Sequence, residues 1–449
     1  MKKYDSYKDS GIEWIGDIPK HWDESKIKYL SKEPNSLFID GDWIESKVII
    51  EEGIRYITTG NIKVGYYSEQ GTGFISEETF DELNCTEVFE GDLVISRLNN
   101  PIGRACIIPN LNNRIVTSVD NVIFRPDSNV NKFYLLYLFS SKEYFEITDL
   151  ISRGATMQRI SRGLYGNIKI PLPSIEEQTA IANYLNHKTT QIDTLIAKKE
   201  QFISLLHEER TAVINQAVTK GLDPKVQMKD SGIEWLGEIP DHWEVKKLKY
   251  VGNCQNGISE GAEFFGTGHP FVSYSDVYKN DVLPKNVFGL ANSNEKHQEN
   301  YSVEESDVFF TRTSETVEEI GIASICNHRI EKAVFAGFLI RFRPNKDLII
   351  KEFSKYYFRC FIPRTFFVKE MNLVTRASLS QELLKRLPTL LPSINEQQRI
   401  ATFLDKKTSE IDIVIFKSKQ EIELLKEYKT ALISEVVTGK VDVRDVVLN

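Results

Sequence analysis

Arginine, threonine and glutamine are concentrated in one segment of an otherwise acidic chain. Residues 150–170 read LISRGATMQRISRGLYGNIKI and contain four basic residues and no acidic one, whereas the full 449 residues carry a formal charge of −8. An arginine guanidinium makes bidentate, charge-assisted hydrogen bonds with phosphate, and threonine and glutamine can reach base edges. The alternative is a solvated basic surface. The candidate nucleic-acid contacts of this segment are Arg153, Thr156, Gln158, Arg159 and Arg162.

A second basic segment, residues 363–387, has five basic residues against Glu370 and Glu382. It reads NLVTRASLS where the first segment reads RGATMQ, so the two segments agree only loosely. Their recurrence at equivalent places in the chain favours phosphate binding over a solvated surface. The candidate contacts here are Arg364, Arg376, Ser378 and Ser380.

Two further arginines, Arg97 and Arg312, each end a short apolar run typical of a strand. Each can reach a phosphate or a guanine edge, or it can pair inside its domain with a carboxylate such as Asp92 or Asp307, and both interpretations stay open. Polar residues of the following loops are also candidates, although Glu315, Glu318 and Glu319 would repel phosphate. The loop candidates are Asn99, Asn100 and Arg104 after the first run, and Thr313 and Ser314 after the second.

Motifs for catalysis are incomplete or missing in this sequence. Residues 264–268, FFGTG, are similar to an S-adenosylmethionine loop, but no catalytic tetrapeptide follows and a turn is the better interpretation. Asp241 and residues 244–246 imitate a PD…ExK nuclease site with too short a spacer. There is no GxxxxGK[ST] or HExxH motif, and the seven histidines and five cysteines show no ligand spacing. We therefore predict no catalytic residue, no metal and no cofactor bound by this chain.

The elements that position these candidates occur twice. DSGIEWIGDIPKHW (9–22) and DSGIEWLGEIPDHW (230–243) agree at 11 of 14 positions, and residues 172–193 match residues 391–412 in the same way. The chain is therefore a tandem duplication. The loops after Arg97 and Arg312 differ in length between the copies, so one scaffold carries two unlike loops.

After each LPS tripeptide, apolar residues recur in alternating steps of four and three, which predicts two helices of about 45 residues with a coiled-coil seam. Gly221 and Gly439 are the expected stops. Each helix could pack on its own domain, but the matching seams favour pairing of the two helices with each other. An antiparallel pair is expected because the segment that joins the helices is a complete globular domain. The predicted seam residues are Leu185, Ile192, Ile196, Ile203, Leu206, Val213, Leu404, Ile411, Ile415, Ile422, Leu425 and Leu432.

Bulk composition is that of a folded protein with several domains. Hydrophobic residues make up 41% and charged residues 27% of the chain. No apolar run approaches the length of a membrane span and the first residues do not resemble a signal peptide, so we expect a cytoplasmic protein.

The repeated SGIEWxGxIPxHW segment, the GDLVISR strand followed by IGRA, and IPLPSIEEQ leading into a long helix resemble the specificity subunit of type I restriction-modification enzymes. The resemblance implies two target-recognition domains that read the halves of a bipartite, asymmetric site in double-stranded DNA. It also implies that the helices set the gap between half-sites and dock two modification (methyltransferase) subunits, which restriction subunits then join. S-adenosylmethionine, ATP and Mg²⁺ are expected in those partners. A duplicated coiled-coil scaffold that binds only proteins is the alternative function.

The predicted fold is α+β, with two mixed α/β domains in tandem joined by two long helices that form an antiparallel coiled coil with pseudo-twofold symmetry. The expected boundaries are target-recognition domains at 1–173 and 221–392, spacer helices at 174–220 and 393–440, and a tail at 441–449.

Overall fold

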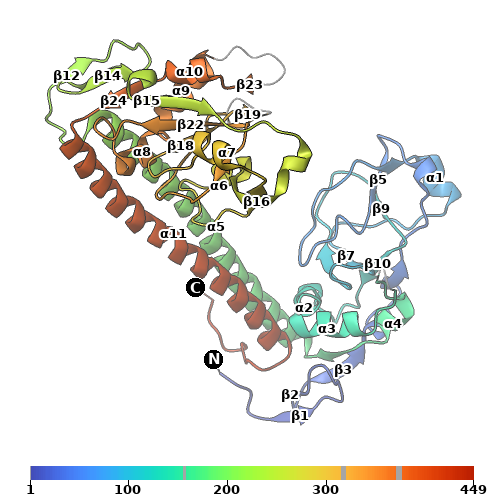
Figure 1. The fold of residues 1–449 in the computed structure, drawn as a ribbon. Coiled ribbons are helices and arrows are strands. Elements are labelled where there is room, and N and C mark those ends of the chain that lie inside the picture. The colour runs from blue at the N-terminus through green and yellow to red at the C-terminus, as the bar shows by residue number, and fades with distance from the viewer. Residues whose placement is uncertain (1, 155–157, 315–319, 371–376, 449) are drawn as a thin grey trace. The chain divides into compact units, whose positions relative to one another are not determined.

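The computed structural model describes residues 2–154, 158–314, 320–370 and 377–448. The chain divides into two compact units (Figure 1). Unit 1 contains Met1–Glu200 and Lys419–Asn449, and unit 2 contains Gln201–Ser418. Each unit therefore combines one mixed domain with part of each long helix. The mixed domains and the two long helices agree with the predicted α+β fold.

Short strands and short helices make up the domain of unit 1. Its strands are β1 (Tyr7–Asp9), β2 (Asp17–Pro19), β3 (Asp23–Lys26), β4 (Leu37–Asp40), β5 (Ile54–Ile57), β6 (Phe74–Ile75), β7 (Leu93–Ser96), β8 (Ala105–Ile107), β9 (Ile115–Thr117), β10 (Asn121–Arg125) and β11 (Lys169–Leu172). Its helices are α1 (Glu77–Glu82), α2 (Lys132–Leu138), α3 (Lys142–Leu150) and α4 (Arg162–Gly166).

The domain of unit 2 has the same kinds of element. Its strands are β12 (Met228–Asp230), β13 (Glu238–Pro240), β14 (Glu244–Lys247), β15 (Gly252–Asn256), β16 (Phe265–Val272), β17 (Gly289–Ala291), β18 (Val308–Thr311), β19 (Thr313–Ser314), β20 (Ala323–Ile325), β21 (Val334–Phe335), β22 (Leu339–Pro344), β23 (Ala377–Ser378) and β24 (Pro388–Leu391). Its helices are α6 (Tyr274–Lys279), α7 (Glu295–Asn300), α8 (Lys351–Tyr357), α9 (Phe361–Glu370) and α10 (Gln381–Lys385).

Sheet topology confirms the duplication. The antiparallel sheet β4-β10-β7-β8 of unit 1 has its counterpart in β15-β22-β18-β20 of unit 2. The sheets β6-β5-β9 and β17-β16-β21 each contain one parallel pair, β5 with β9 and β16 with β21. The two predicted strands that end near Arg97 and Arg312 are β7 and β18, which occupy the same place in the two four-stranded sheets.

One expectation about unit 2 is wrong. The FFGTG segment is not a turn, because Phe265–Gly268 belongs to strand β16. Phe265 and His269 both pair with Ala291 of β17, so the intervening residues form an irregularity in the strand. Glycine at two positions with positive φ, Gly266 and Gly268, permits this bulge.

Two long helices follow the domains. Helix α5 spans Ile175–Lys220 and α11 spans Ile394–Val437, with 46 and 44 residues. Each ends before a glycine in the left-handed region, Gly221 or Gly439, both at φ 76°. At 1.5 Å per residue, α5 is about 69 Å long.

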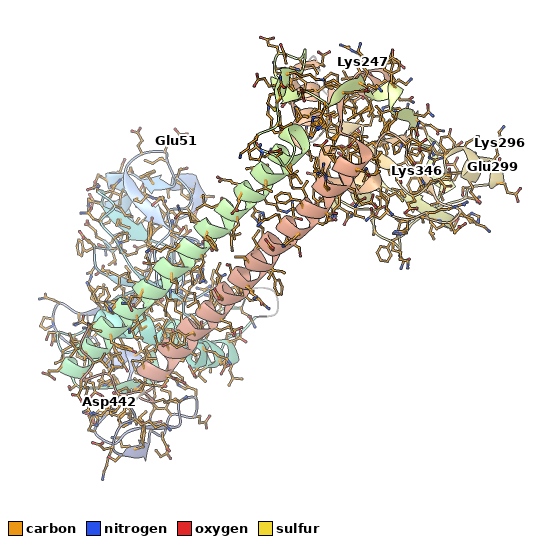
Figure 2. All side chains as sticks on the ribbon, turned by 90° about the vertical axis from the view of Figure 1, so that its left-hand side faces the viewer. Glu51, Lys247, Lys296, Glu299, Lys346 and Asp442 are labelled. Atoms are coloured by element: carbon orange, nitrogen blue, oxygen red, sulfur yellow. The ribbon has the colours of Figure 1, made fainter. Side chains whose placement is uncertain are left out.

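The long helices pack both on a domain and on each other. Both kinds of packing considered from the sequence are therefore present. In unit 1, Leu185 of α5 and Leu432 of α11 share one core with Trp22. In unit 2, Leu206 contacts the cluster of Ile411 and Ile415. The start of one helix meets the end of the other within each unit, which confirms the antiparallel direction (Figure 2).

Ion pairs on the two units repeat the duplication. In unit 1, Lys429 Nζ lies 2.7 Å from Asp193 Oδ2, and in unit 2, Arg210 Nε lies 3.2 Å from Asp412 Oδ1. These are equivalent positions in the two copies. All twelve predicted seam residues are buried or half-buried.

Each long helix is also tied to its domain by a histidine. His21 Nε2 lies 2.8 Å from Glu177 Oε2 in unit 1, and His242 Nε2 lies 2.9 Å from Glu396 Oε2 in unit 2. Both glutamates lie in the first turn of a long helix. In the part of the chain that the structure describes, no helix is long and apolar enough to cross a membrane.

Candidate nucleic-acid interface

In unit 1, the segment that follows β7 lies beside the arginine-rich segment. Leu98 forms an antiparallel bridge with Arg159, and the Asn99 N–H donates to the Gln158 carbonyl over 3.3 Å. The Ile160 N–H donates to the Arg97 carbonyl over 3.1 Å. The structure thus brings together two sets of candidates that are far apart in the sequence.

Unit 2 repeats this pairing. Strand β19 pairs antiparallel with β23, with Thr313 opposite Ser378, and the Leu379 N–H donates to the Arg312 carbonyl over 2.7 Å. We call each pair of segments the ribbon of its unit: residues 98–99 with 158–159 in unit 1, and β19 with β23 in unit 2. A two-stranded ribbon is one of the elements that fit the DNA major groove.

Three arginines of unit 1 lie at the surface of this ribbon. The main chains of Arg153 and Arg159 bond to each other over 2.8 and 3.0 Å. The Arg159 side chain is 46% exposed, and its Nη2 lies 2.9 Å from Asp120 Oδ1. Arg162 is half-buried, with 41% of its side chain exposed; its Nε lies 3.5 Å from Asp40 Oδ2, and its Nη1 donates to the Phe38 carbonyl over 3.2 Å. These guanidinium groups are oriented by carboxylates and still accessible to an anion from solvent.

Arg97 is buried, and of its two interpretations the structure shows the internal one. Its Nε lies 3.2 Å from Asp40 Oδ1, and its other nitrogens donate to the Ile160 and Val119 carbonyls. The partner proposed from the sequence, Asp92, instead binds Arg125 over 2.8 Å. Burial lowers the pKa of Arg97. We therefore remove Arg97 from the DNA-contact set and assign it to holding the ribbon on the sheet.

Arg104, another candidate DNA contact, is also buried, and the structure shows its guanidinium bonded inside the domain. Its guanidinium donates to four carbonyl oxygens, and burial lowers its pKa. The acceptors are Ile62 at 2.6 Å, Leu98 and Thr59 at 2.7 Å, and Pro101 at 3.0 Å. A side chain with this many internal acceptors shapes the loops and is not available to a ligand.

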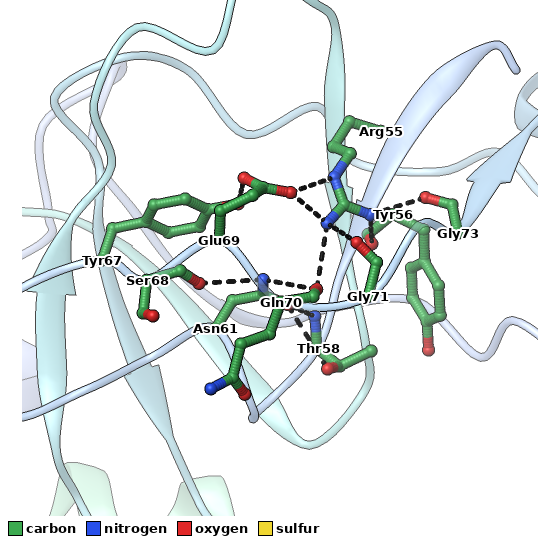
Figure 3. A network of polar contacts seen from close by, with 10 residues as sticks. All are labelled: Arg55, Tyr56, Thr58, Asn61, Tyr67, Ser68, Glu69, Gln70, Gly71 and Gly73. Carbon is green, nitrogen blue, oxygen red and sulfur yellow. Dashed lines mark hydrogen bonds and ion pairs between the residues drawn. The ribbon is translucent and has the colours of Figure 1, made fainter. Parts of the chain in front are cut away.

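Arg55, which was not predicted from the sequence, also bonds to the loop between β5 and β6 (Figure 3). It bonds to Glu69 and to the carbonyls of Gln70, Gly71 and Gly73 over 2.5 to 3.1 Å. Together with Arg104 it fixes the loop between β5 and β6. An arginine at the start of an apolar strand was the available signal.

The remaining candidates of unit 1 are two exposed residues, one half-buried residue and one residue outside the described part of the chain. Asn99 and Asn100 are exposed and line an open cavity of about 620 Å³ together with Lys142. Gln158 is half-buried in the ribbon. Thr156 lies outside the described residues.

In unit 2 the candidates are only partly brought together. Arg312 is half-buried, Thr313 and Ser378 face each other in the ribbon, and Ser380 caps α10 by accepting the Leu383 N–H over 3.1 Å. Arg364 lies on α9, where it lines a separate cavity of about 210 Å³. The Ser314 side chain and Arg376 lie outside the described residues. Asp307 binds Arg343, at 2.7 Å, and not Arg312.

The protein contains two copies of one mixed domain. Each copy packs on the antiparallel long helices and has a polar ribbon at its surface, which defines a duplicated two-domain recognition protein. A profile of the type I restriction modification DNA specificity domain matches residues 19–204 and 240–424. Because these ranges cover most of the chain, the protein belongs to this family.

Curated relatives agree with this assignment. The EcoKI specificity subunit of Escherichia coli K12 is 25% identical over 300 residues, which span 65% of this chain and 62% of the relative. The MjaVIII specificity subunit of Methanocaldococcus jannaschii is 24% identical over 434 residues, which span 92% of this chain and 96% of the relative.

Two solved structures share the fold. One, from work on complex assembly and conformational transition of the type I R-M system, has a TM-score of 0.70 at 14% identity and covers 94% of this chain and 99% of its own. The HsdS subunit of Thermoanaerobacter tengcongensis has a TM-score of 0.57 at 14% identity and covers 94% of this chain and 98% of its own.

Proposed function

We propose that this chain is the DNA sequence-specificity subunit of a type I restriction-modification complex. Each unit reads one half of a bipartite, asymmetric site in double-stranded DNA. The observation that carries the proposal is the repeated ribbon: its main-chain pairing is the same in both units, but Arg159 stands where unit 2 has Ser378. One scaffold with different side chains suits the reading of two different half-sites.

The chain itself contributes recognition and no catalytic step in this proposal. Modification subunits dock on the two long helices and supply adenine methylation with S-adenosylmethionine, and restriction subunits supply ATP- and Mg²⁺-dependent cleavage. Two linked readers raise affinity and specificity together, because binding of the first unit converts binding of the second into an intramolecular event.

The test is to express the full chain with its modification subunits in a host that lacks other methyltransferases, and to sequence the methylated genome. We expect one motif with two short specified parts and a gap of fixed length. A duplex carrying this motif should give a split footprint with the purified complex. If an assembled complex protects no sequence and leaves no methylated motif, the chain is a protein-binding scaffold and the proposal fails.

A further inference from the structure

One aromatic side chain of unit 2 is exposed beside the ribbon. Phe338 lies in the turn between β21 and β22 and is 64% exposed. The Arg312 N–H donates to the Phe338 carbonyl over 2.9 Å, and Arg312 directly precedes β19. A single exposed aromatic ring is common on a protein surface, and what distinguishes the Phe338 ring is its place on the residue that binds Arg312, directly before the ribbon.

The equivalent position in unit 1 has opposite chemistry. There the Arg97 N–H donates to the Asp120 carbonyl over 2.8 Å, so Asp120 occupies the place that Phe338 has in unit 2. The Asp120 carboxylate pairs with Arg159 of the ribbon. Unit 1 therefore presents a charged pair, whereas the same two positions of the scaffold carry Phe338 and Ser378 in unit 2.

The turn that carries Phe338 is held by main-chain hydrogen bonds. The Gly337 N–H donates to the Ile258 carbonyl over 2.7 Å, and the Leu339 N–H donates to the Ala336 carbonyl over 3.0 Å. A Cβ atom at Gly337 would overlap Ser259 Oγ, so the turn packs closely against the segment after β15. Because the main chain is already fixed, a contact made by the ring costs little ordering entropy.

We infer that Phe338 contacts the C5 methyl group of a thymine in the half-site read by unit 2. This inference rests on the proposed function. A two-stranded ribbon fits the major groove, where the thymine methyl is the apolar group among hydrogen-bonding base edges, and phenylalanine is a suitable apolar partner for it. Unit 2 thus selects a thymine by apolar contact at the position where unit 1 uses charge.

The experiment uses the full chain assembled with its modification subunits. Once the methylated motif is known, each thymine of both half-sites is replaced in turn by uracil, which lacks only the C5 methyl group. At one position, wild type should bind the thymine duplex roughly fourfold more tightly than the uracil duplex, as expected for one methyl group removed from water. Phe338→Ala should bind the two duplexes equally, and Phe338→Leu should retain part of the difference.

Tyr250→Ala is the matched control, because Tyr250 is 63% exposed and precedes β15, at the opposite end of that strand from the turn. It should discriminate thymine from uracil as wild type does. The inference is overturned if no thymine–uracil difference of wild type is removed by Phe338→Ala. It is also overturned if this variant only lowers the amount of assembled complex, which would make Phe338 a protein contact. Failure of the proposed function itself is recognised separately, as absence of any sequence-specific binding by wild type.

Discussion

At the scale of single residues, the arginines of unit 1 fall into two groups. Arg97 and Arg104 are buried, donate hydrogen bonds inside the domain and position the loops. Arg159 and Arg162 instead form ion pairs with Asp120 and Asp40 at the surface. An exposed ion pair contributes only about 0–1 kcal/mol, so a phosphate can replace the carboxylate at little cost. The carboxylates orient the arginines before DNA arrives.

Replacing Arg159 and Arg162 together by alanine should weaken DNA binding roughly tenfold and lower the salt dependence. Each phosphate contact contributes about 0.9 to the slope of log K against log salt, so the loss of two contacts should reduce the slope by about 1 to 2. Affinity of the assembled complex, measured from 50 to 200 mM salt, checks this.

The control is Arg329→Ala with Lys332→Asn, which removes the same charge from a segment that pairs with Val303 before the start of β18, whereas the ribbon follows the end of that strand. Asparagine suits the positive φ of 57° at residue 332. The slope of this control should stay close to that of wild type. A slope that is unchanged in the Arg159 and Arg162 variant would contradict a phosphate role for these residues.

His242 makes stability depend on pH. Its hydrogen bond with Glu396 raises the pKa of His242 above the ordinary value of 6.5. A raised pKa means that the folded state favours the protonated ring, so this stabilisation is fully present below about pH 6.5 and is lost as pH rises through the higher folded pKa. It amounts to at most about 1 kcal/mol, because the side chain is about half exposed and screened by water.

We therefore expect His242→Gln to lower the melting temperature by about 2–4 °C at pH 6 and hardly at all at pH 9. Thermal unfolding of both proteins across this range checks the prediction. His207→Gln, at an exposed position of α5, is the control. A difference that grows with pH would contradict the assignment.

Residue roles were only partly predictable from the sequence. That Arg97 ends a strand followed from the apolar run before it, but its partner Asp40 lies on β4, and β4 and β7 come close only because both pair with β10 in the folded sheet. Phe338 was missed because FAGFLIRF looks like a core strand, and only the turn after β21 exposes that one ring. Contacts set by tertiary register leave no local pattern.

At the scale of elements, the seam of the long helices was predictable. Burial of a helix pair repeats every 3.5 residues whatever the surroundings, so spacing alone identified positions such as Ile192, Leu206 and Ile411, which are buried. The domain side of the same helices was not predictable in this way. Ile181 and Val436, which are not among the predicted seam residues, share a core with domain residues whose places depend on the sheets.

Alanine substitutions at a buried seam residue and at an exposed residue of the same helix should have different effects on the free energy of unfolding. Ile411→Ala should lower the free energy of unfolding of unit 2 by about 2–4 kcal/mol, because Ile411 is 7% exposed and leaves a cavity. Ile413→Ala, two residues further on at 51% exposure, should cost less than about 1 kcal/mol. Urea unfolding of both variants checks this, and equal effects would show that the seam does not carry the stability.

At the scale of the whole molecule, the duplication was evident from repeated motifs, but the composition of the two units was not. Sequence order suggests domain, helix, domain, helix. The folded chain instead builds unit 1 from its first 200 residues and its last 31, because the end of α11 packs on the first domain. Burial of apolar residues at the end of α11 decides this division, and linear order does not show it.

Lengthening both helices should change the gap between half-sites. One heptad inserted into each helix beside Lys199 and Glu421, which form an ion pair, preserves the seam and adds about 10 Å. We expect the unspecified part of the methylated motif to grow by about three base pairs, at 3.4 Å each. Methylome sequencing checks this, and an unaltered gap in a stable, active complex would show that the helices do not set it.

The shared core of unit 1 has a consequence for how the protein is made. Leu432, Ile433 and Val436 complete a core that otherwise comes from the first half of the chain, and the Asp442 N–H bonds to the Lys2 carbonyl over 2.9 Å. Unit 2 is one continuous stretch and can close as soon as it leaves the ribosome. The domain that is translated first therefore cannot complete its core until Leu432, Ile433 and Val436 have been synthesised. Until then, part of its apolar interior stays exposed to solvent.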